Sequence, residues 1–221
     1  MKSTRKNRRG LQQTKKHHEP YSDKQYIHKA LYQKKCEYGT GTFSKMNIPK
    51  GVIIIKETPE ILNSESMDDV SGTSAEYGIK LIKYLLQYKK TQFIQLVPDH
   101  LDDTANVDYD SIREYHQRYL PELDQETMVL YYMKYKRNIF KFDDKHAILF
   151  TATKMNHSCN PHVTYYKRKN QMWFETVRPI KAGEEVFDSY IFTRDDRTMR
   201  QEALLRRYGF DCKCDKCSNN E

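Results

Sequence analysis

The sequence contains no long hydrophobic run. Its longest uninterrupted aliphatic stretch is Val52 to Ile55, whereas a helix that spans a bilayer needs about 20 mostly apolar residues. The first residues are basic, and they lack the apolar segment that a secretory signal requires. These absences predict a protein without a membrane span that resides inside the cell, in the nucleus or the cytoplasm.

Cysteine and tryptophan are also scarce, with five cysteines and one tryptophan among 221 residues. Inside a cell the cysteines should be reduced thiols, which are available to a metal rather than paired in disulfides. By contrast, 17 tyrosines and 9 phenylalanines argue against a disordered chain, because such chains are poor in aromatic residues. The length predicts one globular domain, or one domain with an insertion.

Acidic residues are absent from residues 1 to 18, which contain seven Lys or Arg and so supply 7 of the 8 net positive charges. A solvated extension is the simplest interpretation of this tail, and nuclear targeting or loose contact with nucleic acid are the alternatives. Basic residues are absent in turn from 57 to 79, where six acids occur, and only two basic residues accompany nine acids from 99 to 126. These acids either scatter over the solvent-facing surface or form an electronegative surface that attracts a lysine-rich peptide.

Strand-forming residues concentrate near both ends of the body of the chain. The segments Gly39 to Phe43 and Val52 to Ile55 flank a Pro-Lys-Gly turn and predict a hairpin whose apolar strand is buried. The segments His162 to Lys167 and Gln171 to Val177 predict a second hairpin. A further Ile-x-x-Gly turn opens the segment from Glu184 to Ile191.

The middle of the chain has helical patterns. Residues 76 to 97 place apolar side chains at near-helical spacing before Pro98, and residues 126 to 137 predict another helix. Ser111 with Glu114 predicts a capping box for a short helix between them. A tyrosine stripe here is interpreted as packing rather than as a cofactor site: Tyr115, Tyr119, Tyr131, Tyr132 and Tyr135. A last helix is predicted from about Asp195 to Arg207, closed by Gly209.

The spacing Cys212-Lys-Cys214-Asp-Lys-Cys217 is the strongest chemical signal. Three thiolates this close suit a tetrahedral zinc site better than a set of relaxed disulfides. Such a site lacks one ligand, and Cys159, Cys36 or a histidine could supply it. A redox cluster or a coincidental one is the alternative.

A second signal is the segment Asn156-His157-Ser158-Cys159-Asn160-Pro161. Together with Gly183-Glu184-Glu185 through Tyr190, the terminal cysteines and the opening Gly39-Thr40-Gly41, it follows the order found in SET-domain protein methyltransferases. Over residues 36 to 217 the chain resembles that family, and it is most similar to the branch whose members often carry a MYND zinc finger. No cysteine lies between 36 and 159, so we expect that finger to be missing.

The resemblance implies a mainly β fold with α-helices: small curved SET sheets, a helical insert and a zinc-binding post-SET segment at the carboxyl end. It divides the chain into a basic extension (1–30), the SET amino-terminal part (31–62), the insert (63–137), the SET carboxyl-terminal part (138–193) and the post-SET segment (194–221).

The resemblance also implies S-adenosylmethionine as methyl donor and a lysine channel opposite it. Tyr190 takes the catalytic position, and Tyr208 would line the channel. The implied cofactor-binding residues are Tyr38, Gly39, Thr40, Asn138, Asn156, His157 and Phe210. Asn138 could equally cap the end of a helix. The implied zinc ligands are Cys159, Cys212, Cys214 and Cys217, with Cys159 preferred to Cys36.

One position departs from the family. SET enzymes commonly have an aromatic-Asp-Tyr sequence at the catalytic tyrosine, whereas this chain reads Phe187-Asp188-Ser189-Tyr190. Aligned without a gap, Asp188 takes the place of an aromatic residue that helps to set how many methyl groups are added. A one-residue bulge that restores Phe187 to this place is the alternative.

The leading hypothesis is therefore a zinc-stabilised lysine methyltransferase that acts on a basic protein or peptide, a histone tail being one candidate. A second hypothesis is an inactive SET scaffold that binds chromatin or protein partners. A third is a zinc protein that binds nucleic acid through its basic tail, which would give an affinity with a steep salt dependence.

Overall fold

The computed structural model describes residues 24–37, 39–62, 74–101 and 107–219. The basic tail and Tyr38 lie outside these residues, as do parts of both acidic stretches. The strands are β1 (Tyr26–Ile27), β2 (Leu31–Cys36), β3 (Gly39–Ser44), β4 (Ile53–Glu57), β5 (Ile139–Phe142), β6 (Lys145–Ile148), β7 (Val163–Arg168) and β8 (Gln171–Thr176). The helices are α1 (Ala75–Tyr88), α2 (Lys90–Ile94), α3 (Arg113–Tyr119), α4 (Gln125–Asn138), α5 (Arg197–Tyr208), α6 (Asp215–Ser218) and the 3-10 turn η2 (Ala152–Lys154).

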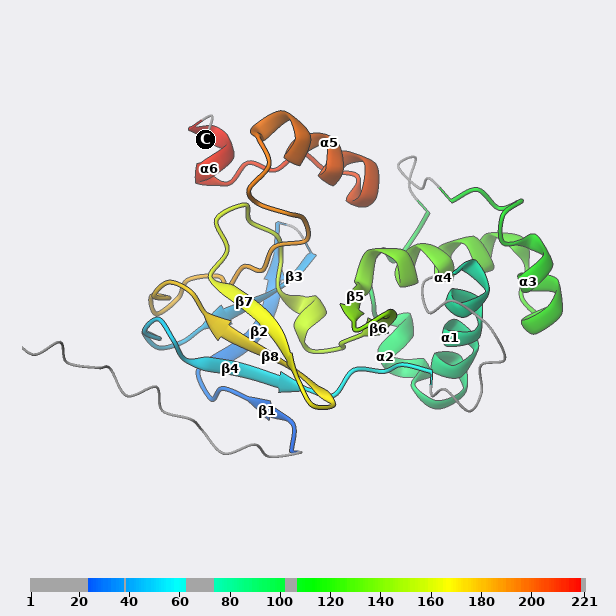
Figure 1. The fold of residues 1–221 in the computed structure, drawn as a ribbon, viewed down its shortest axis with the longest axis horizontal. Coiled ribbons are helices and arrows are strands. Elements are labelled where there is room, and N and C mark those ends of the chain that lie inside the picture. Colours follow the sequence, from blue (N-terminus) through cyan, green and yellow to red (C-terminus); the bar gives the residue numbers. More distant parts are fainter. Residues whose placement is uncertain (1–23, 38, 63–73, 102–106, 220–221) are drawn as a thin grey trace, which may run out of the picture.

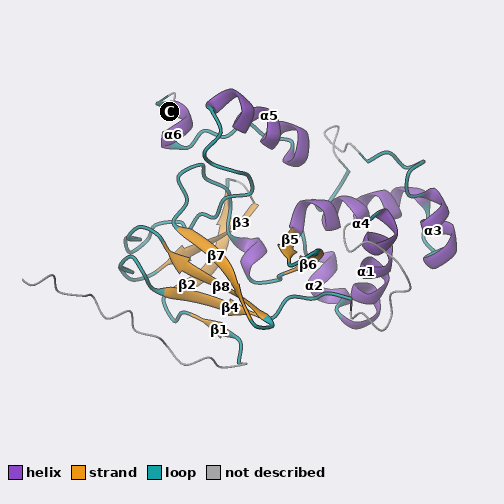
Figure 2. Cartoon of the chain, viewed as in Figure 1, coloured by secondary structure: helices purple, strands orange, loops and turns teal. Residues whose placement is uncertain are grey.

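Strands and helices gather in different parts of the molecule (Figures 1 and 2). The largest sheet has four antiparallel strands in the order β1-β4-β8-β7. Its hairpin β7–β8 pairs Arg168 with Gln171, as the sequence predicts. Apolar side chains from β4 and β8 form a buried core with Ile48, Ile180 and Val186, so this module depends on segments that are far apart in the chain.

The first predicted hairpin is wrong. Strand β3 pairs with β2, from Leu31 opposite Ser44 to Cys36 opposite Gly39. Strand β4 pairs instead with β1 and β8. Residues 49 to 51 do form a turn, but the turn carries the chain from one sheet to another. The composition thus located both strands, but β3 pairs with the strand just before it and β4 pairs with β8, which is distant in the sequence.

The helical insert packs beside the sheets as a separate cluster (Figure 1). The predicted helix 76–97 is two helices, because the chain breaks the helical conformation at Lys89 between α1 and α2. The predicted capping box is wrong: Ile112 precedes α3, and the Ser111 hydroxyl donates to the Asp108 carbonyl. The tyrosine stripe packs against buried side chains of the insert, which confirms its interpretation as packing.

The hairpin β5–β6 and turn η2 connect the insert to the sheet module. Beyond them, α5 begins after its cap Asp196 and ends at Gly209, which has a left-handed φ of 76°. The described part of the chain includes no helix that combines the length and the apolar character needed to cross a bilayer. Helices α5 and α6 lie over one end of the sheet module, so the carboxyl-terminal cysteines come close to the segment after η2 (Figure 1).

Candidate active site

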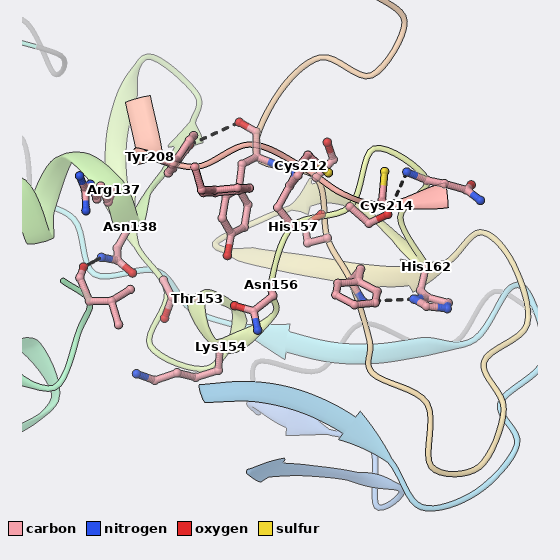
Figure 3. Close-up of a pocket in the computed structure, with 18 of the residues that line it drawn as sticks. Arg137, Asn138, Thr153, Lys154, Asn156, His157, His162, Tyr208, Cys212 and Cys214 are labelled. Carbon is pink, nitrogen blue, oxygen red and sulfur yellow. Dashed lines mark hydrogen bonds between the residues drawn. The ribbon is translucent and has the colours of Figure 1, made fainter. Parts of the chain in front are cut away.

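A cavity of about 580 Å³ opens where the sheet module, the end of α4 and the carboxyl-terminal segment meet. Figure 3 shows Asn138 and Lys154 on one side of it, His162 and Cys214 on the other, and His157 between them. Its lining includes Thr40, Asn138, Asn156, His157, Tyr190 and Phe210, all of them predicted site residues. The structure thus brings together residues that span 170 positions of the sequence.

Backbone hydrogen bonds hold the Asn156 and Tyr190 segments side by side. The Asp188 N–H donates to the Asn156 carbonyl over 3.0 Å, and the Ser158 N–H donates to the Asp188 carbonyl over 2.9 Å. His157 and Asp188 form a parallel bridge at the same place. The Asn156 side chain donates to Glu185 Oε1 over 2.7 Å, which fixes its orientation beside the cavity.

His157 is a neutral linker rather than an acid or a base. Its Nδ1 accepts from the Tyr190 N–H over 3.0 Å, so the ring proton resides on Nε2, which lies 3.3 Å from Cys159 Sγ. Burial, followed by the charge of Arg200, lowers the pKa of His157 to about 4. An uncharged imidazole therefore connects the Tyr190 segment to the cysteine segment.

Tyr190 lies inside a group of aromatic rings. Its hydroxyl donates to the Met155 carbonyl over 2.9 Å, and its ring centroid is 4.9 Å from that of Tyr208 and 5.3 Å from that of His157. Burial, followed by the charge of Asp188, raises the pKa of Tyr190 far above its ordinary value. The hydroxyl consequently stays protonated and acts as an oriented donor, not as a base.

Tyr208 and Phe210 flank Gly209 at the end of α5 and both face the cavity. The Tyr208 hydroxyl donates to the Tyr190 carbonyl over 3.4 Å, and the ring centroids of Phe210 and His157 are 6.1 Å apart. The left-handed conformation of Gly209 turns the chain sharply between them. One short turn therefore supplies two aromatic walls.

The amino-terminal motif contributes only in part. Thr40 lines the cavity, whereas Gly39 is not among the lining residues, and Tyr38 lies outside the described residues. Gly41 has a steric role instead, because a Cβ there would collide with the Glu185 side chain and lie 3.1 Å from Asn156 Nδ2. Gly41 thus permits two side chains of the protein, those of Glu185 and Asn156, to lie close to its backbone.

Asn138 is the last residue of α4, and its contacts agree with the interpretation that it caps the end of a helix. Its side-chain amide donates to the Val97 carbonyl over 2.6 Å and to the Lys134 carbonyl over 2.7 Å, and the residue is buried. It also lines the cavity. Asn138 therefore fastens the end of the helix to the loop after α2 while it faces the cavity.

The four predicted metal ligands lie together: Cys159, Cys212, Cys214 and Cys217 have their sulfur atoms within 4.8 Å of one another. Cys159 Sγ is 4.0 Å from that of Cys212 and 3.5 Å from that of Cys217. A tetrahedron with zinc–sulfur bonds of about 2.3 Å has edges of about 3.8 Å. The donor set thus fits a zinc ion in both chemistry and spacing, while Cys36 lies elsewhere, 3.4 Å from Asn156 Nδ2.

Arg200 completes the surroundings of these thiols. It is buried, its Nη2 lies 3.7 Å from Cys217 Sγ, and its Nη1 donates to the Asp195 carbonyl over 2.6 Å. Without a metal, burial raises the pKa of Cys159 and that of Cys212. A dication and a guanidinium would together offset the cost of burying several thiolates.

Sequence reasoning missed many residues of the cavity wall, among them Arg137, Thr153, Lys154 and Tyr165. Tyr165 lies on β7, four residues after Pro161, and burial, followed by the charge of Asp188, raises its pKa to about 12. Alternation along the predicted strand could have singled it out, since every second side chain shares a face. Lys154 and Arg137 had no local signal, because a tertiary contact brings them to the cavity.

Comparisons with known proteins agree with this geometry. The SET domain family matches residues 39–191. A SET domain-containing protein of Acanthamoeba polyphaga mimivirus, L678, is 29% identical over 199 residues, which cover 83% of this chain and 75% of that protein. The histone-lysine N-methyltransferase set5 of Schizosaccharomyces pombe is 27% identical, over 83% of this chain and 48% of the enzyme. The N-lysine methyltransferase SMYD2 of Homo sapiens is 28% identical, over 54% of this chain and 29% of the enzyme.

Solved structures share the fold. The SET domain of LSMT bound to lysine and AdoHcy has a TM-score of 0.61 at 12% identity, and covers 83% of this chain and 53% of that one. Rubisco LSMT bound to AdoMet has a TM-score of 0.56 at 13% identity, over 83% and 52%. The family match covers more than half of the sequence and includes the segments that build the cavity, so the chain belongs to the SET-domain family.

Proposed function

We propose that this protein transfers methyl groups from S-adenosylmethionine to a lysine side chain of a protein substrate. The single observation that carries the proposal is the convergence of Asn156, His157, Tyr190 and Tyr208 on one cavity. Two relatives named above are lysine methyltransferases, and related folds hold AdoMet or lysine. The chain spans about half or less of those two enzymes, so the activity of the whole protein is part of the proposal.

The bound sulfonium supplies the methyl group, and the residues of this chain position the donor and the amine. Thr40, Asn156 and His157 with Phe210 would bind the donor on one side, and Asn138 with Lys154 would bind its other end. Tyr190 and Tyr208 would form the walls of the lysine channel. Two reactants aligned near 3 Å avoid much of the entropic cost of meeting in solution, so positioning provides a large part of the acceleration.

A zinc ion held by the four cysteines has a structural role in this proposal. It would join residues 212 to 217 to Cys159 and so hold Tyr208 and Phe210 against the cavity. Metal binding is then linked to folding of the carboxyl-terminal segment, because the ligand set exists only in the folded chain.

The substrate class is a basic protein or peptide, with histones as one candidate and a nuclear location as another part of the hypothesis. The acids of the insert, such as Asp110 and Glu114, favour lysine-rich partners through their charge. The catalytically inactive scaffold remains the competing function. Contact of the basic tail with nucleic acid is a separate proposal that concerns residues outside the described structure.

The decisive experiment incubates the purified full chain with methyl-labelled S-adenosylmethionine, recombinant core histones and total cell protein, followed by mass spectrometry. We expect labelled ε-N-methyllysine in at least one acceptor, and none with Tyr190→Phe. Binding of the donor without label in any protein would instead identify the chain as a scaffold. Label in cell protein but not in histones would exclude histones as the substrate and still support lysine methyl transfer as the reaction.

A further inference from the structure

Asp188 is the one acidic residue buried in the aromatic part of the described cavity wall. It is 3% exposed, lines the cavity, and belongs to the segment that ends at Tyr190. Phe187 does not take its place, because the Phe187 ring stacks on His162 with centroids 5.8 Å apart. An alignment without a bulge therefore agrees with the structure, and the position that is commonly aromatic carries a carboxyl group.

The Asp188 carboxyl group lies within electrostatic reach of the tyrosine hydroxyls of the channel. After burial, its negative charge is the next cause that raises the pKa of Tyr190 and that of Tyr165. It also contributes to the raised pKa of Tyr208, after burial and the opposing charge of Arg207. The charge of one carboxyl group thus acts on three tyrosine hydroxyls, from β7, α5 and the Tyr190 segment, and all four residues line the cavity.

No cation compensates this carboxyl group in the described part of the chain. The Ser189 N–H is the hydrogen-bond donor that acts on it, and no Lys, Arg or His nitrogen among the described residues lies within 4.0 Å of it. Burial raises the pKa of Asp188 to about 7. Its electrostatic neighbours include the three tyrosines and the neutral His157 of the paired segment, none of which carries a positive charge near pH 7. A buried carboxylate without a cation is costly, so a cationic ligand is the partner that its surroundings lack.

We propose that the Asp188 carboxylate binds the ammonium group of the substrate lysine in the channel and accepts its proton before methyl transfer. This inference rests on the proposed function, since it assigns a residue to that reaction. It answers a specific chemical need, because a lysine with a pKa near 10.4 is only about 0.04% neutral at pH 7.

The step balances in protons and electrons. One proton moves from the ammonium nitrogen to a carboxylate oxygen of Asp188, which leaves a neutral amine beside a neutral acid. The amine lone pair then forms the nitrogen–carbon bond as the carbon–sulfur bond breaks, and the bonding pair stays on sulfur. The product is a methylated ammonium and a thioether, and Asp188 afterwards releases its proton to water.

The test compares Asp188→Asn with wild type across pH 6 to 10, with core histones and total cell protein as acceptors and S-adenosylmethionine binding measured by calorimetry. We expect kcat/KM to fall by about 100-fold at pH 7, a size typical of general-base catalysis. The defect should shrink to less than about tenfold at pH 10, where about a quarter of the lysine is already neutral. Donor affinity should change by less than about threefold. Asp143→Asn is the matched control, because this exposed acid of the β5–β6 turn pairs with Lys167 and is not among the residues that line the cavity.

The pH profile of the wild type is the second readout. With Asp188 as base, kcat/KM levels off above about pH 7. A reaction that depends on lysine already deprotonated in solution instead rises with unit slope towards pH 10. This readout decides the matter if the Asn variant fails to fold. Equal profiles for wild type and variant, or a unit slope in wild type, would overturn the inference alone. A wild-type chain that labels nothing overturns the proposed function, and this inference with it.

Discussion

The backbone N–H of Tyr190 donates to Nδ1 of His157 over 3.0 Å. The opposite ring nitrogen of His157 lies 3.3 Å from Cys159 Sγ, so one imidazole joins the aromatic channel to the thiol cluster. A change in the thiols can therefore displace the tyrosine without any direct contact between them. This relationship connects the proposed structural metal to the proposed chemistry.

Tyr190→Phe removes the hydroxyl that donates to the Met155 carbonyl. We expect methyl transfer to fall by about 100-fold or more, because the oriented donor at the channel is lost. The unfolding free energy should change by only about 1 kcal/mol, the usual net contribution of one hydrogen bond. Labelled methyl transfer and thermal unfolding are the measurements. Tyr166→Phe changes an exposed tyrosine of β7 that is not among the cavity-lining residues, so it is the control and should keep full turnover. Unchanged turnover in Tyr190→Phe would exclude the assigned role.

Cys159→Ser removes the thiol that bridges the two segments of the cluster. We expect purified wild type to contain about one zinc ion per chain and the variant to contain much less, because a structural zinc site needs all four ligands. Inductively coupled plasma mass spectrometry provides the count. Cys36→Ser should retain the metal, since Cys36 lies apart from the cluster beside Asn156. Full zinc content in Cys159→Ser would refute the ligand assignment.

Arg200→Gln removes a buried cation from the thiol cluster while its length is partly kept. We expect zinc affinity to fall by about 10- to 100-fold, the range found when groups that support metal ligands are lost. Competition with a chromogenic chelator measures the affinity directly, without reference to activity. Arg206→Gln changes an exposed arginine of the same helix and should leave the affinity as it is. An equal loss in both variants would point to helix charge rather than to the cluster.

Asn138→Ala leaves the Val97 and Lys134 carbonyls without their side-chain donor. We expect the unfolding free energy to drop by about 1–3 kcal/mol, because buried carbonyls lose their partner. If Asn138 also binds the methyl donor, calorimetry should show weaker S-adenosylmethionine binding at a temperature well below unfolding. Asn138→Asp separates the two roles, since it keeps the shape but replaces the amide donor with an acceptor. Lower stability with unchanged donor affinity would confine Asn138 to the structural role.

Local sequence determined a large part of this protein. The helix from 197 to 208 follows from a capping aspartate and a closing glycine, and the hairpin β7–β8 follows from alternation around a short turn. Ordered motifs identified the family, because each can be recognised in the sequence itself. They are Asn156–Pro161, Gly183–Tyr190 and the terminal cysteines. Such signals depend on neighbours within a few residues, which is why they could be read from the chain alone.

Only the tertiary structure decided which distant segments meet. Strand β4 pairs with the distant β8 and β3 pairs with the preceding β2, so a plausible turn at residues 49 to 51 gave the wrong hairpin. The same packing places Lys154 at the cavity, turns Phe187 towards His162 and puts Asp188 in the cavity wall with three tyrosines. The physical reason is that local preferences fix backbone conformation, whereas the environment of a charge depends on everything folded around it.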